Sequence, residues 1–176
     1  MSISDIIIQG LGLIAAALMI TSFQCRTNRN LFALQFAAAT FFAVQFILLG
    51  GLTGSVVLII GMLRNLLLLQ FHRGWPQKKR WMWLVIAAYV AATALTYKNA
   101  MSLLPLLAMV TGTIFMWTDN RGLIRMANLC VACPAWLIYD IYIGSYGGII
   151  NEVFIIISIL ISIKRYGFRS LMEEKE

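Results

Sequence analysis

Apolar segments long enough to cross a lipid bilayer follow one another along almost the whole chain. They are about 17 to 20 residues long, close to the length that a helix needs to cross a hydrocarbon core of ~30 Å. Hydrophobic residues make up 61% of the 176 residues and charged residues only 12%, which is too little polar surface for soluble domains. We therefore predict an all-α integral membrane protein with seven transmembrane helices. The predicted helices cover residues 6–23, 31–49, 53–70, 81–97, 101–117, 124–143 and 148–164.

The positively charged residues lie almost entirely in alternate connecting segments. Of the 14 lysines and arginines, 12 follow the first, third, fifth or seventh predicted helix. Only Lys98 lies on the other side, and only Arg64 lies deep within a helix. Because lysine and arginine gather in cytoplasmic loops, we predict a periplasmic N-terminus and a cytoplasmic C-terminus. The net charge of +7 is then a topology signal, and no nucleic-acid partner is expected.

Two parts of the chain share a weak internal similarity. Predicted helices one to three match helices five to seven in length and loop charge, and helix four is left over. One extra crossing restores the orientation of an odd-numbered unit, which predicts a 3+1+3 parallel repeat. The predicted domains are repeat one over 1–70, a basic loop and linker helix over 71–98, and repeat two with a cytoplasmic tail over 99–176. An offset of 92 pairs Asn28 with Asn120 and Arg29 with Arg121, and an offset of 94 pairs Phe42 with Trp136, Gln45 with Tyr139, and Gly54 with Gly148.

This plan and two short stretches resemble the SWEET and PQ-loop transporter superfamily, which includes the single-repeat SemiSWEETs. The stretch "GLIAAALMITSFQCR" is similar to the start of such a repeat. The stretch "WLIYDIYIGSYGGIIN" is similar to their Trp-x-x-Tyr, short turn and helix-starting Asn. The whole sequence looks most like the YgjV-type bacterial inner-membrane proteins. The resemblance implies a SWEET-like fold in the bacterial inner (plasma) membrane, with a solute site between two three-helix bundles.

The resemblance also implies roles for polar and aromatic residues of the two repeats. Asn151 fits the position that faces the substrate, whereas its partner in the first repeat is Val57, which cannot complete a two-Asn sugar clamp. Trp136 either packs at an interface or forms the floor of the cavity, as in the relatives. The predicted substrate-binding residues are Asn151, Trp136, Tyr139, Phe42 and Gln45.

Helix two carries a polar face of its own. Gln35, Ala38, Phe42 and Gln45 recur at steps of three, four and three, which places two amides on one helical face. This face either packs inward with hydrogen bonds to neighbouring helices or lines a solute path.

Three charged residues are candidates for a solute pathway. An ionisable group at mid-membrane costs about 2.5–3.5 kcal/mol on insertion scales, so it usually faces the protein interior or water. Asp140 and Glu152 are either hydrated carboxylates at the membrane surface or an acidic vestibule that attracts cations or relays protons. Arg64 either extends its side chain to the cytoplasmic surface or is buried against an acceptor. A buried Arg64 favours an anionic substrate.

Prolines and cysteines offer further hypotheses. Pro105 and Pro134 each remove a backbone hydrogen bond within a predicted helix, as hinges or as structural kinks. Cys130 and Cys133 form the Cys-x-x-Cys pair that a membrane thiol-redox protein would need, although buried thiols also behave as small hydrophobes. His72 is the single histidine, so no metal or cofactor is expected. We find no nucleophile–base pair and predict no enzyme activity.

Together these patterns predict a small-solute transporter or facilitator that works by alternating access between the two bundles. Its expected partners are the lipid bilayer and an unknown small solute, and a homo-oligomer is an open alternative. A second hypothesis is a receptor or assembly module on the same fold, with the basic loop 72–80 as its contact face. A thiol-redox protein that uses Cys130 and Cys133 is the third.

Overall fold

The computed structural model describes residues 3–22, 28–68, 79–118 and 121–166, and these residues form helices and turns without a strand. Residues 23–27, most of the basic loop 72–80 and the tail 167–176 lie outside the described residues. A helix occupies each of the seven predicted intervals. The helices are α1 (Ile3–Ser22), α2 (Asn28–Leu48), α3 (Leu52–Leu68), α4 (Lys79–Thr96), α5 (Leu103–Met116, after a 3₁₀ turn over Ala100–Ser102), α6 (Arg121–Ala127), α7 (Cys133–Ile143) and α8 (Tyr146–Tyr166).

The helices expose large apolar side chains and bury polar ones, which is the reverse of the usual pattern in a soluble protein. Three are long and apolar enough to cross a bilayer, namely Ile3–Ser22, Gly122–Ile143 and Tyr146–Lys164. Shorter apolar helices cover Ala33–Leu48, Leu52–Leu68 and Ala100–Met116. Large apolar side chains such as Ile6, Leu63 and Ile161 are exposed, whereas Gln45, Thr113 and Asp140 are buried. The prediction of an all-helical membrane protein is confirmed.

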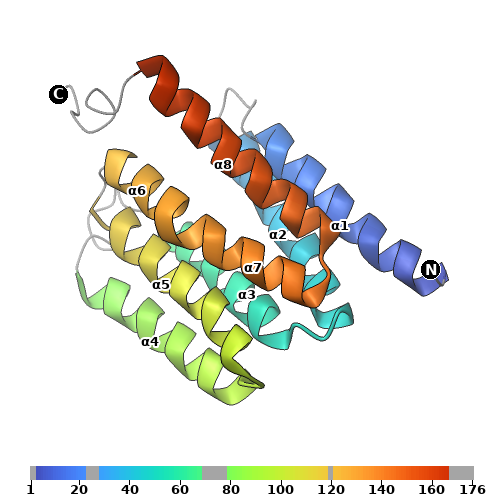
Figure 1. Cartoon of the computed structure of the whole chain (residues 1–176). Coiled ribbons are helices and arrows are strands. Elements are labelled where there is room, and N and C mark those ends of the chain that lie inside the picture. The colour runs from blue at the N-terminus through green and yellow to red at the C-terminus, as the bar shows by residue number, and fades with distance from the viewer. Residues whose placement is uncertain (1–2, 23–27, 69–78, 119–120, 167–176) are drawn as a thin grey trace.

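Six helical units close into a ring. α1 packs against α2, α2 against α3, α3 against α5, α5 against α7, α7 against α8, and α8 returns to α1. α4 packs outside this ring, on α3 and α5 (Figure 1). In this order α3 and α8 are opposite members of the ring.

Two tight turns, 94 residues apart, have the same backbone geometry. Gly50 and Gly144 adopt positive φ values of 78° and 74°, which favour glycine because it has no Cβ. The N–H of Gly51 donates to the carbonyl of Phe46 (2.7 Å), and that of Ser145 donates to Asp140 (2.8 Å). This is the Schellman arrangement that ends a helix and starts the next one antiparallel beside it. The two turns therefore place α3 next to α2, and α8 next to α7.

Glycine contacts bring the helices close together at one end of the bundle, which we call the closed end. A Cβ on Gly147 of α8 would strike the backbone of Gly12 of α1. A Cβ on Gly148 would strike the carboxyl group of Asp140. Such close approach of small residues is a principal means of helix association in membranes. At the opposite end, α8 diverges from α6 (Figure 1).

The Gly12–Gly147 contact predicts a specific sensitivity to a single methyl group. Gly147→Ala forces α1 and α8 apart and should lower the free energy of unfolding by about 1–3 kcal/mol, the usual cost of overpacking. Gly10→Ala is the matched control, because a Cβ there meets nothing within 4 Å. It should be neutral or stabilising by up to about 1 kcal/mol, since alanine is the better helix former. Thermal unfolding in detergent measures both variants, and equal stabilities would contradict the close contact.

Candidate functional site

A cavity of about 550 Å³ occupies the centre of the ring. It extends from Gly148 and Asp140 near the closed end to Arg125 and Ser162 near the other end, which we call the open end. Every member of the ring contributes to its wall. The lining includes Met19 of α1, Phe42 of α2, Leu58 of α3, Met109 of α5, Trp136 of α7 and Glu152 of α8. The lining is mostly apolar with a few polar groups, as is typical of small-molecule sites.

A hydrogen-bonded network of α1, α2 and α8 seals the closed end. The Gln9 side chain donates to the carbonyl of Gly144 (2.7 Å) and accepts from the N–H of Tyr146 (3.2 Å). Gln45 donates to Gln9 (3.4 Å), and Ser145 donates to Gln45 (3.0 Å). Gln45 and Ser145 are fully buried, so each polar group needs such a partner. The predicted substrate residue Gln45 therefore lies in the seal and does not line the cavity.

Aromatic side chains of α2 and α7 pack together and form an aromatic floor of the cavity. Ring centroids are 6.1 Å apart for Phe42 and Phe46, 5.9 Å for Phe46 and Trp136, and 6.0 Å for Trp136 and Tyr139. The hydroxyl of Tyr139 accepts a hydrogen bond from the N–H of Gly54 (3.2 Å). Phe42 and Trp136 line the cavity, whereas the predicted substrate residue Tyr139 is buried beneath it.

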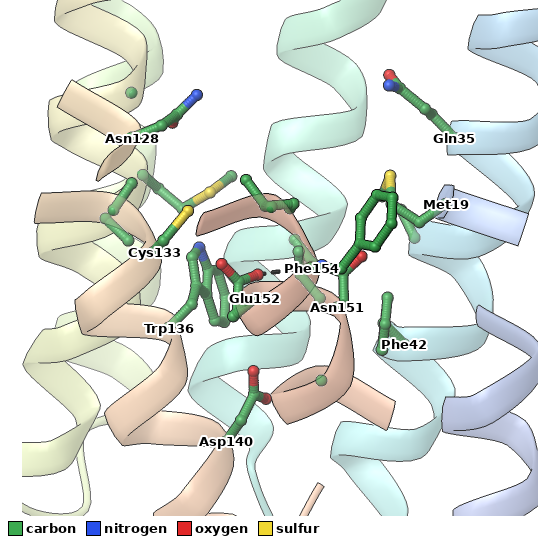
Figure 2. Close-up of a pocket in the computed structure, with 18 of the residues that line it drawn as sticks. Met19, Gln35, Phe42, Asn128, Cys133, Trp136, Asp140, Asn151, Glu152 and Phe154 are labelled. Carbon is green, nitrogen blue, oxygen red and sulfur yellow. Dashed lines mark hydrogen bonds between the residues drawn. The ribbon is translucent and has the colours of Figure 1, made fainter. Parts of the chain in front are cut away.

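The wall formed by α7 and α8 is rich in hydrogen-bond acceptors. Asn151 donates to the carboxylate of Glu152 (3.1 Å; Figure 2). The thiol of Cys133 lies near the same carboxylate. Asp140 and Glu152 are only 2% and 8% exposed. Within the described residues, Oδ1 of Asp140 and Oδ1 of Asn151 are buried and have no hydrogen-bond donor. Both carboxylates thus lie inside the protein rather than on its hydrated surface.

Arg64 lies in the opposite wall, on α3. Its side chain is 6% exposed and lines the cavity, so it is buried rather than extended to the surface. Nε and Nη2 both donate to the side-chain oxygen of Asn65 (3.2 and 2.9 Å), and Nη1 donates to the hydroxyl of Thr113 (3.0 Å). Both acceptors are neutral. Among the described residues no carboxylate pairs with Arg64.

A short π-helix over Asn128–Ala132 widens the helix between α6 and α7. The N–H of Cys133 reaches the carbonyl of Asn128, five residues back, directly before Pro134. Such bulges are frequent at functional sites, and this one brings Asn128 and Cys133 to the cavity wall. Pro105, by contrast, lies in the first turn of α5, where the backbone N–H has no intrahelical partner in any case.

The two cysteines of the Cys-x-x-Cys pair differ in their surroundings. Cys130 is exposed and Cys133 is buried, and both are free thiols. Within the described residues, no group of three His, Cys, Asp or Glu side chains is arranged to hold a metal ion.

Several site residues were not predicted from the sequence. Gln9, Thr113 and Asn128 are isolated polar residues in apolar segments, and Ser145 lies in the glycine-rich turn. Their polarity within the membrane-length segments was a usable signal, because such groups need partners. Of the five predicted substrate-binding residues, Asn151, Trp136 and Phe42 line the cavity.

Comparison with known proteins assigns the chain to a family without assigning an activity. No curated protein matches the sequence, and no solved structure matches it. A family model described as "Bacterial inner membrane protein" matches residues 6–170, which is nearly the entire chain and includes every cavity residue named above. The protein therefore belongs to the Imp-YgjV family of bacterial inner membrane proteins.

Proposed function

We propose that this protein moves a small solute across the bacterial inner membrane by alternating access of the central cavity. The observation that carries the proposal is a partly polar cavity that is sealed at one end by the Gln9–Gln45–Ser145 network and reaches Ser162 at the other. A site that is accessible from one side at a time is the basic requirement of a carrier.

The contact pattern supports two three-helix bundles that are related by a repeat. Exchanging α1 with α5, α2 with α7, and α3 with α8 maps the ring of contacts onto itself. The α3–α5 contact then corresponds to the α8–α1 contact, and the two glycine turns correspond at an offset of 94. We infer seven membrane-spanning units, with α4 as the linker between the bundles. The two bundles would rock about the α3–α5 and α8–α1 interfaces.

The distribution of lysine and arginine assigns a direction to the molecule. With a periplasmic N-terminus, the closed end faces the periplasm and the open end faces the cytoplasm. The described structure then corresponds to an inward-facing state. Opening to the periplasm requires α1 and α8 to separate at Gly12 and Gly147, with loss of the hydrogen bonds between Gln9 and the backbone of residues 144 and 146.

Cysteine accessibility tests this orientation. In a background without native cysteines, Ser158→Cys in the cavity wall should react with a membrane-impermeant thiol reagent faster in inside-out vesicles than in right-side-out vesicles. Ser145→Cys, which replaces a fully buried serine of the seal, should be protected on both sides. Lys98→Cys is the control for the periplasmic face, because Lys98 is exposed and donates to the carbonyl of Gly50 at the closed end. Equally fast labelling of Ser158→Cys from the two sides would contradict a resting state that is open only to the cytoplasm.

Locking the seal tests transport itself. Proteoliposomes are incubated with a mixture of small metabolites, and the solutes trapped inside are identified by mass spectrometry. We expect at least one solute to accumulate above the level in empty liposomes. Joining Gln9→Cys of α1 to Tyr146→Cys of α8 with a reducible bifunctional reagent should lower this accumulation at least tenfold, and reduction should restore it.

The Gln9→Cys protein treated with the same reagent is the control for chemical modification. Full accumulation in the cross-linked protein would show that the seal does not open during transport. Accumulation of no solute at all would favour the non-transporting receptor or assembly module.

A further inference from the structure

Arg64 carries a charge that the described residues do not neutralise. The guanidinium has five N–H groups, and three of them bind Asn65 and Thr113. Two N–H groups, one on each terminal nitrogen, have no acceptor among the described residues. Arginine does not lose its proton in proteins, so the charge persists in the cavity wall. A buried, uncompensated cation of this kind calls for an anion.

Asn65 and Thr113 hold the guanidinium in place without neutralising it. The Thr113 hydroxyl donates to the carbonyl of Met109 (2.7 Å), so its oxygen is left to accept from Nη1 of Arg64. Asn65 receives two N–H groups of Arg64 on a single oxygen. A guanidinium fixed in this way keeps its planar donor fork ready for a carboxylate or phosphate.

The opposite wall has the reverse chemistry. Oδ1 of Asp140 and Oδ1 of Asn151 lack donors among the described residues, and Glu152 adds a second carboxylate. Figure 2 shows Asp140, Asn151 and Glu152 grouped where α7 meets α8. Hydroxyl or ammonium groups of a solute would find hydrogen-bond acceptors there.

We infer that the cavity binds a small organic acid, with its single anionic group on Arg64 and hydrogen-bond donors on Asp140, Asn151 and Glu152. The inference rests on the proposed transport function, since it specifies the solute of the same cavity. Arg64, Asp140, Asn151 and Glu152 all line this cavity, so a solute that fills it can reach both walls. A volume of about 550 Å³ is within the range of small-molecule sites and accommodates a six-carbon acid.

Arg125 extends the positive potential towards the entrance. It is half-buried, lines the same cavity, and belongs to α6 at the open end. An anion that enters from that end therefore passes Arg125 before it reaches Arg64. Focused charge of one sign raises the local concentration of an oppositely charged solute and its association rate.

Four six-carbon probes separate the contributions of the two walls. Gluconate carries an anion and hydroxyl donors, sorbitol has the hydroxyls alone, hexanoate has the anion alone, and 6-aminohexanoate combines the anion with an ammonium group. Calorimetry on the purified full-length protein in lipid nanodiscs measures binding without flux. We expect gluconate or 6-aminohexanoate to bind at least tenfold more tightly than both sorbitol and hexanoate. Whichever of the two binds more tightly identifies the donor as hydroxyl or ammonium.

Variants assign the preference to the named residues. Arg64→Gln should abolish the preference for gluconate over sorbitol, and Arg64→Lys should retain part of it because the charge remains without the planar fork. Glu152→Gln should weaken 6-aminohexanoate at least tenfold and gluconate less, because the amide oxygen still accepts from a hydroxyl. Arg80→Gln is the matched control, since Arg80 is exposed and packs over Trp81 on α4 outside the ring.

The inference is wrong if sorbitol binds the wild-type protein as tightly as gluconate, if Arg64→Gln keeps the preference for the acid, or if no probe binds. These outcomes are distinct from failure of transport. If the protein binds the acid but accumulates no solute in proteoliposomes, the anion site stands and the proposed transport function is wrong. If the protein accumulates neutral solutes and Arg64→Gln does not change that accumulation, the transport function stands and the anion site is wrong.

Discussion

The backbone contact between Gly12 and Gly147 closes the ring of helices, and the cavity depends on that closure. Only residues without a Cβ allow α1 and α8 to approach so closely. The approach brings Gln9 within reach of the backbone of residues 144 and 146, and of the Gln45 amide. In a hydrocarbon environment an unpaired amide costs several kcal/mol, so packing and hydrogen bonding reinforce each other in the seal. The same contacts that hold the two halves together must part if the cavity is to open at that end.

The cavity has a guanidinium in one wall and two carboxyl groups in the facing wall, and among the described residues no ion pair joins them. Arg64 is held by neutral acceptors on α3 and α5, while Asp140 and Glu152 lie on α7 and α8. Burying an unpaired ion costs several kcal/mol even after relaxation, and the cavity carries this cost at Arg64. Close helix contacts and the aromatic floor of Phe42, Phe46, Trp136 and Tyr139 offset it elsewhere in the molecule. A solute that supplies the missing partners would stabilise the structure that binds it.

The sequence predicted the positions of the helices better than it predicted which side chains of each helix face the cavity. Long apolar runs and glycine turns fix where helices begin and end, so a helix was found in each predicted interval. Whether a polar residue lines the cavity or the seal depends on partners far away in sequence. Gln45 accepts a hydrogen bond from Ser145, which is 100 residues later in the chain. Arg64 donates one to Thr113, which is 49 residues later. The π-helix was also invisible to helical periodicity. The regular spacing that would place Cys130 and Cys133 on one face does not hold there, and one is exposed while the other is buried.

Differences between equivalent positions of the proposed repeat explain why the cavity has two unlike walls. At an offset of 94, Phe46 corresponds to Asp140, Val57 to Asn151, and Leu58 to Glu152. In each pair the acceptor is on the second bundle and the apolar residue on the first. Arg64 and Ser158 reverse the asymmetry, because the charge lies on the first bundle and a small hydroxyl on the second. A symmetric pair of amides, one from each bundle, would bind a solute that presents similar groups to both bundles. The observed arrangement suits instead a solute whose two ends differ in charge, held by Arg64 from one bundle and by Asp140, Asn151 and Glu152 from the other. Because each end binds a different bundle, such a solute would draw the bundles together as it binds, and this coupling between binding and closure is what a rocking carrier requires.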